Sequence, residues 1–67
     1  MDFELTQDYI ELIKLLKVTG VAESGGMAKA LVENEQVYYN GVVDLRKRLK
    51  LRKGDHIRVD DVEINIV

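Results

Sequence analysis

The sequence contains no cysteine, no proline and no tryptophan, and its single histidine is His56. Without cysteine, disulfides and thiolate metal sites are excluded, and one histidine alone does not make a zinc site. We therefore expect no metal and no cofactor. A domain of 67 residues buries only about 60% of the surface of its unfolded chain. Its stability must come from apolar side chains, which make up 46% of the residues.

Long apolar runs are absent as well. Charged residues interrupt every hydrophobic stretch well before the roughly 20 apolar residues that a membrane-spanning helix requires. The first residues, MDFELTQDY, are acidic where a secretory signal is basic. There is also no proline, low-complexity run or internal repeat to indicate a linker. We expect residues 1–67 to form a single cytoplasmic domain without a membrane partner.

Positive charge is scarce outside one short stretch, residues 46–53, which we call the basic segment. Twelve acids outnumber ten lysines and arginines, which gives a net charge of −2, yet six of the ten bases lie in the basic segment. Residues 46–58 hold seven bases and one acid, whereas the rest of the chain holds three bases and eleven acids. Crowded cations repel one another unless an anion lies near. The basic segment therefore predicts a surface for a phosphate backbone.

Other interpretations of the basic segment stay open. It could be an ordinary solvated strand or loop, a nuclear-localisation peptide or a helix on a membrane surface. Leu45, Leu49 and Leu51 interrupt the charges and predict that the segment is tied to the core, whereas a localisation peptide more often lies in a flexible tail. Only Leu45 and Leu49 keep a helical spacing, which argues against a membrane helix.

Two segments have the apolar periodicity of a helix. In residues 7–20, spacings of three and four predict an apolar face made of Tyr9, Leu12, Ile13 and Leu16. A second helix begins after Ser24, a favourable N-cap, and its predicted apolar face consists of Met27, Ala28, Leu31 and Val32. Gly25 and Gly26 follow the cap, although each glycine costs roughly 1 kcal/mol against alanine within a helix. Two glycines at a helix start therefore indicate a structural or functional requirement at these positions.

Five strands are predicted from period-two alternation and turn residues. Residues 2–5 form the first strand, before the helices. Asn40-Gly41 between two apolar runs predicts a hairpin, because a type I′ turn requires positive φ at both central positions. Residues 56–59 and 62–66 form the last two strands, joined by an Asp-Asp turn. The order β-α-α-β-β-β-β predicts an α+β fold with two helices packed on a small, mostly antiparallel sheet.

The start of the second helix is a candidate phosphate site. Bare backbone N–H groups of Ser24, Gly25 and Gly26 at a helix N-terminus could accept a phosphate, and Lys29 would add a cation one turn on. The alternative is a capped helix start whose glycines allow close packing.

The remaining polar residues do not predict catalysis. His56 beside Asp55 follows a glycine turn, and no nucleophile has an evident place beside it. A chain of this size has little room for a deep cleft, so we expect no small-molecule substrate and no enzyme activity. Of Tyr38 and Tyr39, one must face the core, and the other could stack on a base.

The order of these features resembles the small RNA-binding domain of the ribosomal protein S4 type. The residues that match this S4-like pattern are Ser24, Ala28-Lys29, Leu31-Val32, Asn40-Gly41 and Gly54-Asp55. Two positions depart from it: Gly25 stands where many members carry arginine, and Glu35 replaces a usual glycine. The chain looks most like compact, free-standing bacterial members of the YaaA/YbcJ type.

The resemblance implies an αL-type RNA-binding motif and a non-catalytic protein that contacts the phosphate backbone of structured RNA. It points to ribosomal RNA or a ribosome-associated role. Carried over by position, the RNA contacts are Ser24, Gly25, Gly26, Lys29, Asn40, Gly41, Arg46, Lys47, Arg48 and Lys50. Two alternatives remain: an adaptor that docks the basic segment on an acidic protein, and DNA binding.

Overall fold

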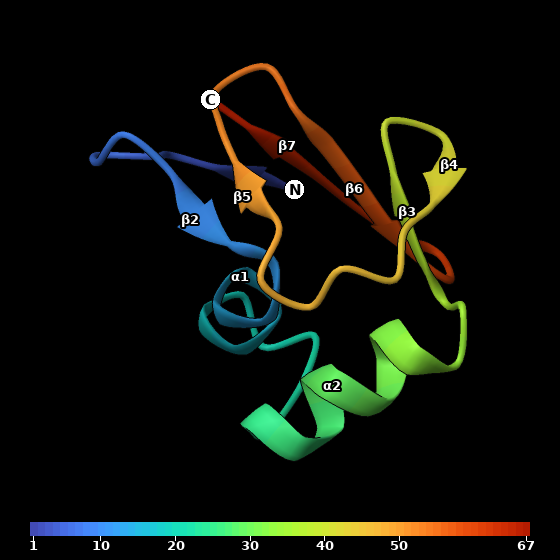
Figure 1. The fold of residues 1–67 in the computed structure, drawn as a ribbon. Coiled ribbons are helices and arrows are strands. Elements are labelled where there is room, and N and C mark those ends of the chain that lie inside the picture. Colours follow the sequence, from blue (N-terminus) through green and yellow to red (C-terminus); the bar gives the residue numbers. More distant parts are fainter.

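The fold combines a five-stranded sheet, two helices on one side of it and a separate two-stranded sheet (Figure 1). The computed structural model describes residues 1–67. The strands of the larger sheet are β1 (Asp2–Phe3), β3 (Val37–Tyr39), β4 (Val42–Val43), β6 (His56–Val59) and β7 (Val62–Ile66). Their order is β1-β7-β6-β3-β4, with β1 parallel to β7 and the other pairs antiparallel. The predicted α+β fold is confirmed.

The β3–β4 hairpin turns at the predicted dipeptide. Asn40 has a φ of 49° and Gly41 a φ of 89°, so both central residues are in the left-handed region, as a type I′ turn requires. The Asp-Asp turn between β6 and β7 is also present, with Asp60 at a φ of 53°.

The first helix begins later than its periodicity predicts. Helix α1 spans Leu12–Val18, while the preceding residues form strand β2 (Ile10–Glu11), which pairs with β5 (Lys50–Leu51). Tyr9 consequently lies outside α1, and its ring is exposed instead of belonging to an apolar helix face. These two short strands are additional to the predicted ones.

Long-range strand pairing explains why α1 begins later than the periodicity predicts. Ile10 is the register partner of Leu51, and both side chains are buried in the core. The backbone N–H of Leu12 donates to the carbonyl of Leu49 at 2.9 Å, and that of Ile13 to the carbonyl of Lys47 at 3.2 Å. The basic segment thus satisfies N–H groups that the start of α1 would otherwise leave without partners.

Helix α2 (Gly25–Glu33) has the predicted N-cap and an unexpected C-terminus. The N–H of Met27 donates to Oγ of Ser24 at 3.1 Å. At the other end, the N–H of Glu35 donates to Val32 and that of Gln36 to Leu31, which is the Schellman pattern. Glu35 has a φ of 59°, a conformation that favours glycine. With seven and nine residues, neither α1 nor α2 has the length to traverse a bilayer.

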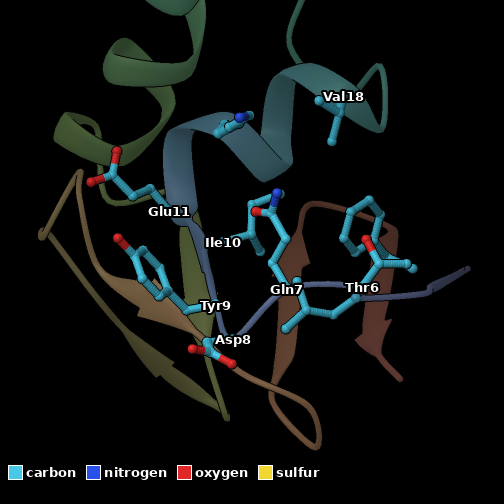
Figure 2. Close-up of a pocket in the computed structure, with 10 residues that line it drawn as sticks. Thr6, Gln7, Asp8, Tyr9, Ile10, Glu11 and Val18 are labelled. Carbon is cyan, nitrogen blue, oxygen red and sulfur yellow. The ribbon is translucent and has the colours of Figure 1, made fainter.

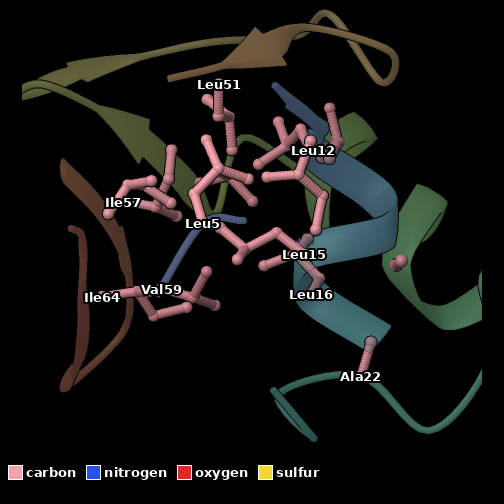
Figure 3. Packing of buried hydrophobic residues seen from close by; sticks show 14 residues of the cluster. Leu5, Leu12, Leu15, Leu16, Ala22, Leu51, Ile57, Val59 and Ile64 are labelled. Atoms are coloured by element: carbon pink, nitrogen blue, oxygen red, sulfur yellow. The ribbon is translucent and has the colours of Figure 1, made fainter. Parts of the chain in front are cut away.

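The core lies between the helices and the larger sheet (Figure 3). It contains 14 buried residues, all hydrophobic, and no buried side-chain polar atom lacks a hydrogen-bond partner. Leu12, Leu15 and Leu16 of α1 face Ile57 and Ile64 of the sheet (Figure 3). The second helix contributes Ala28 and Val32, while Met27 of its predicted apolar face is exposed.

Candidate nucleic-acid interface

The basic segment leads from β4 to β5 through a turn at residues 46–49, where the N–H of Leu49 donates to the carbonyl of Arg46 at 3.2 Å, and more and less exposed side chains alternate along it (the yellow-to-orange chain in Figure 1). Leu49 is partly buried and Leu51 fully buried, whereas Arg48, Lys50 and Arg52 are exposed. Lys50 and Leu51 form strand β5, so their side chains point to opposite sides, Leu51 into the core and Lys50 into solvent. The residues around a shallow hollow of about 510 Å³ are Arg46, Arg48, Leu49, Lys50 and Arg52. We call the four cations Arg46, Arg48, Lys50 and Arg52 the cationic face.

One predicted anchor of the basic segment was wrong. Leu45 is 57% exposed and does not tie the segment to the core. Leu51 does so, because its side chain is fully buried beside Ile10.

Three cations of the basic segment already have carboxylate partners. Lys47 Nζ lies 2.7 Å from Oε2 of Glu33, and Arg48 Nε lies 3.1 Å from Oε2 of Glu11. Arg46 pairs with Asp44 at 2.7 Å. These pairs relieve part of the repulsion between the crowded cations. An exposed ion pair is worth only about 0–1 kcal/mol, so a phosphate could compete with each carboxylate.

Lys50 and Arg52 differ from Arg46 and Arg48, the other two members of the cationic face, because neither pairs with a carboxylate. The guanidinium of Arg52 donates to the backbone carbonyl of Asp8 at 3.3 Å. Lys50 Nζ lies 4.8 Å from the centroid of the Tyr9 ring. Their charges are therefore the least compensated of the cationic face.

Asp44 fixes the beginning of the basic segment. Its Oδ1 accepts a hydrogen bond from the backbone N–H of Arg46 at 2.8 Å, and its carboxylate also accepts three hydrogen bonds from the Arg46 guanidinium. The side-chain hydrogen bond from Arg46 lowers the pKa of Asp44 below its usual value. The same contact raises the pKa of Arg46.

Asp55 fixes the other end. Its Oδ2 accepts from the backbone N–H of Arg52 at 2.8 Å, and its Oδ1 accepts from Asn40 Nδ2 at 3.3 Å. Asn40 Oδ1 in turn accepts from the N–H of His56 at 2.8 Å. Both ends of the Asn40 amide are thus engaged within the protein, and Asn40 with Gly41 forms the hairpin tip. In this structure Asn40 positions the end of the basic segment.

The N-terminal tip of α2 (Ser24, Gly25 and Gly26) lies apart from the cationic face. Lys47 reaches Glu33, the last residue of α2, and nine helical residues span about 13 Å. Lys17 of α1 lies beside the tip, since its Cδ would be 4.0 Å from a Cβ added at Gly25. No hydrogen bond or ion pair joins the tip to the basic segment. Lys29 is exposed on α2 and forms no ion pair.

Tyr9 is a residue that the sequence reasoning missed. The residue is 38% exposed, and its ring lies beside two members of the cationic face: Lys50 Nζ is 4.8 Å and Arg52 Cζ is 5.8 Å from the ring centroid. Figure 2 shows Tyr9 and Glu11 pointing to the same side of the chain, away from Thr6 and Gln7. No local signal marked it, because Asp8-Tyr9-Ile10-Glu11 does not alternate polar and apolar residues and Tyr9 fits the helical spacing of the residues that follow.

The other tyrosines belong to different environments. Tyr39 packs against the core, and its hydroxyl donates to Oδ1 of Asp55 at 3.4 Å. Tyr38 lies on the opposite side of β3, where the guanidinium carbon of Arg58 is 4.2 Å from its ring centroid. His56 pairs with Glu63 at 3.1 Å, and no cluster of histidine and acidic side chains is arranged to hold a metal.

Comparisons with known proteins agree on one family. Residues 3–67 match the model of the S4 domain. YbcJ of Escherichia coli (strain K12), whose name describes it as a candidate RNA-binding protein, is 36% identical over 59 residues, or 88% of this chain and 84% of YbcJ. YbcJ of Shigella flexneri has the same identity and coverage.

A solved structure agrees with the sequence matches. The solution structure of YbcJ from E. coli, described as revealing an ALFAL motif involved in RNA binding, has a TM-score of 0.76 and 34% sequence identity. The alignment covers 98% of this chain and 85% of that one. The nearly complete coverage in sequence and in structure shows that this chain belongs to the S4 domain family.

Proposed function

We propose that this chain is an RNA-binding domain whose cationic face contacts the phosphate backbone of structured RNA. The observation that carries the proposal is the shallow hollow that Arg46, Arg48, Lys50 and Arg52 border together, which gathers four exposed cations on one surface. The S4 domain family and the RNA-binding descriptions of YbcJ support RNA as the polyanion. Residues 1–67 act as one domain, and the function is binding without catalysis.

The geometry of the cationic face suits a run of phosphates. The turn at residues 46–49 gathers the four cations around one hollow of about 510 Å³, where several phosphates of a folded backbone can meet them together. Phosphate contacts position a protein on RNA without reading its sequence, and structured RNA is recognised chiefly by shape. The domain would therefore bind a folded RNA by its backbone, and ribosomal RNA is our candidate ligand. Such a role would take place in the bacterial cytoplasm.

The other positions carried over from the family contribute in different ways. Lys47 either exchanges Glu33 for a phosphate or binds a phosphate at the edge of the cationic face. The α2 tip and Lys29 form a second, weaker phosphate contact. Gly25 offers no side-chain cation there, which gives the cationic face the larger share. Asn40 and Gly41 hold the hairpin in place.

A matched pair of double variants tests the proposal. Lys50→Ala/Arg52→Ala removes one lysine and one arginine from the cationic face, and Lys14→Ala/Arg58→Ala removes the same residue types elsewhere. Both change the net charge equally. Hydrogen bonds to charged groups contribute about 1.5–3 kcal/mol, so the first variant should lose at least about tenfold in affinity for an RNA hairpin. The second should bind nearly as the wild type. Equal losses would contradict a specific face.

Two further comparisons separate the alternatives. RNA and DNA duplexes of equal length should compete unequally, with RNA preferred; equal competition would favour a general nucleic-acid binder. Partners captured from cells should be lost after ribonuclease treatment. If an acidic protein stays bound, the adaptor hypothesis replaces ours. Sequencing the RNA crosslinked to the protein would test the ribosomal assignment.

A further inference from the structure

We propose that Tyr9 is a stacking platform for one unpaired base, so that the preferred ligand is an RNA helix interrupted by a bulge or loop. This inference rests on the proposed function and names the class of RNA. Of the four aromatic residues, Tyr9 is the one whose ring lies among the cations of the cationic face. Tyr38 is beside Arg58 on the other sheet, and Phe3 and Tyr39 pack against the core.

The β2–β5 pairing holds Tyr9 where a base and its phosphate could be bound together. Ile10 is opposite Leu51, so the antiparallel register continues to bring Tyr9 opposite Arg52. The buried side chain of Ile10 anchors the backbone next to Tyr9, while Tyr9 itself remains 38% exposed. The backbone of Tyr9 is therefore held in place and its side chain remains accessible.

The cations beside the ring are those that no carboxylate neutralises. Lys50 and Arg52 can each bind a phosphate on either side of a stacked nucleotide without first breaking an ion pair. Lys47 and Arg48, by contrast, pair with Glu33 and Glu11. An aromatic ring bordered by free cations is the arrangement by which proteins bind unpaired nucleotides.

The ring is open to solvent on the side of the cations. Tyr9 is one of the residues that line a hollow of about 710 Å³, but in Figure 2 its side chain points away from Thr6 and Gln7 of that hollow, and the residue is 38% exposed. A continuous duplex presents no base face to such a site, because its bases are stacked inside the helix. A bulged or looped nucleotide does, at little additional cost.

The experiment compares two RNA hairpins that differ in one nucleotide. One has a fully paired stem, and the other carries a single bulged 5-bromouridine in the same stem. The proteins are the wild type, Tyr9→Phe, Tyr9→Leu and the matched control Tyr38→Leu. We expect the wild type, Tyr9→Phe and Tyr38→Leu to prefer the bulged hairpin by about tenfold. Tyr9→Leu should bind both hairpins with the affinity that the wild type has for the fully paired hairpin, and the salt dependence of its binding should stay unchanged.

The outcomes separate the two proposals. If the wild type binds neither hairpin, the proposed function fails. If it binds both equally and salt-dependently, the function stands and the platform is contradicted. Equal loss by Tyr9→Leu on both hairpins also contradicts stacking and assigns Tyr9 a structural role. Should Tyr9→Leu not fold, photocrosslinking with wild-type protein decides. A crosslink from bromouridine to Tyr9 supports the platform, and crosslinks to other residues alone overturn it.

Discussion

Glu11 is the register partner of Lys50 across β2 and β5, yet its carboxylate bonds Arg48 at 3.1 Å. The Glu11 carboxylate therefore lies among cations, with Lys50 opposite it in the strand pair and Arg48 bonded to it. The inner side of this two-stranded sheet contains Ile10 and Leu51, which are buried. A single pairing thus anchors the basic segment and orients its charges.

Removing the Glu11 charge should strengthen RNA binding. Glu11→Gln frees Arg48 for phosphate and keeps the shape of the side chain. An exposed ion pair is worth about 0.2–1 kcal/mol, so we expect affinity for an RNA hairpin to rise between about 1.4-fold and fivefold. Fluorescence anisotropy measures this, with Glu63→Gln on the other sheet as the control. Unchanged or weaker binding by Glu11→Gln alone would mean that Arg48 does not contact the RNA.

Asp44 should make stability depend on acid pH. Its pKa is lowered by Arg46, so its contribution to the free energy of unfolding is present above about pH 3.9, the unfolded value. It is lost as the pH falls through the lower, folded value. Asp44→Asn keeps an oxygen for the Arg46 N–H but cannot titrate. We expect the melting temperature of the wild type to fall more steeply than that of Asp44→Asn between about pH 5 and about pH 2. Parallel curves would show that the Arg46 contact does not persist in solution.

Replacing Glu35 by glycine should stabilise the folded domain. The φ of 59° at Glu35 costs roughly 1 kcal/mol for a residue with a Cβ, and glycine removes this cost. Glu35→Gly should raise the melting temperature by about 4–8 °C, since 1 kcal/mol shifts a domain of this size by that amount. Asn34→Gly, at a φ of −88°, is the control and should not stabilise. Thermal unfolding followed by circular dichroism gives both values, and a lower melting temperature for Glu35→Gly would refute the assignment.

The anchoring of the basic segment predicts unequal effects of two leucines. Leu51 is fully buried, so Leu51→Ala should cost about 2–5 kcal/mol, comparable to the whole stability of so small a domain. Leu45 is 57% exposed, and Leu45→Ala should change stability by less than about 0.5 kcal/mol. Urea denaturation measures both. Similar effects would contradict the inward and outward alternation on which the cationic face depends.

Local signals in the sequence were sufficient for much of the fold. The Asn40-Gly41 turn, the Ser24 cap and the alternation in the last two strands each depend on neighbouring residues, and each prediction was confirmed. The family resemblance also rested on such ordered local signals.

The pairing of β2 with β5 could not be predicted in this way. Ile10 and Leu51 are 41 positions apart, and Ile10 fits a helical spacing as well as a strand. The burial of Ile10 and Leu51 in the core favours the strand pairing over a longer helix. Because Tyr9 was assigned to the helix, its place beside Lys50 and Arg52 was missed. The sequence predicted a cationic surface, and the tertiary pairing determines which cations share it.

The salt dependence of RNA binding tests the cationic face most directly. If four phosphates are neutralised, log affinity should fall against log salt with a slope of about −3 to −4, from about −0.7 to −0.9 per phosphate. Lys50→Ala/Arg52→Ala should make the slope shallower by about 1.4 to 1.8, and Lys14→Ala/Arg58→Ala should leave it unchanged. A slope near zero for the wild type, or the same slope in both double variants, would contradict the account.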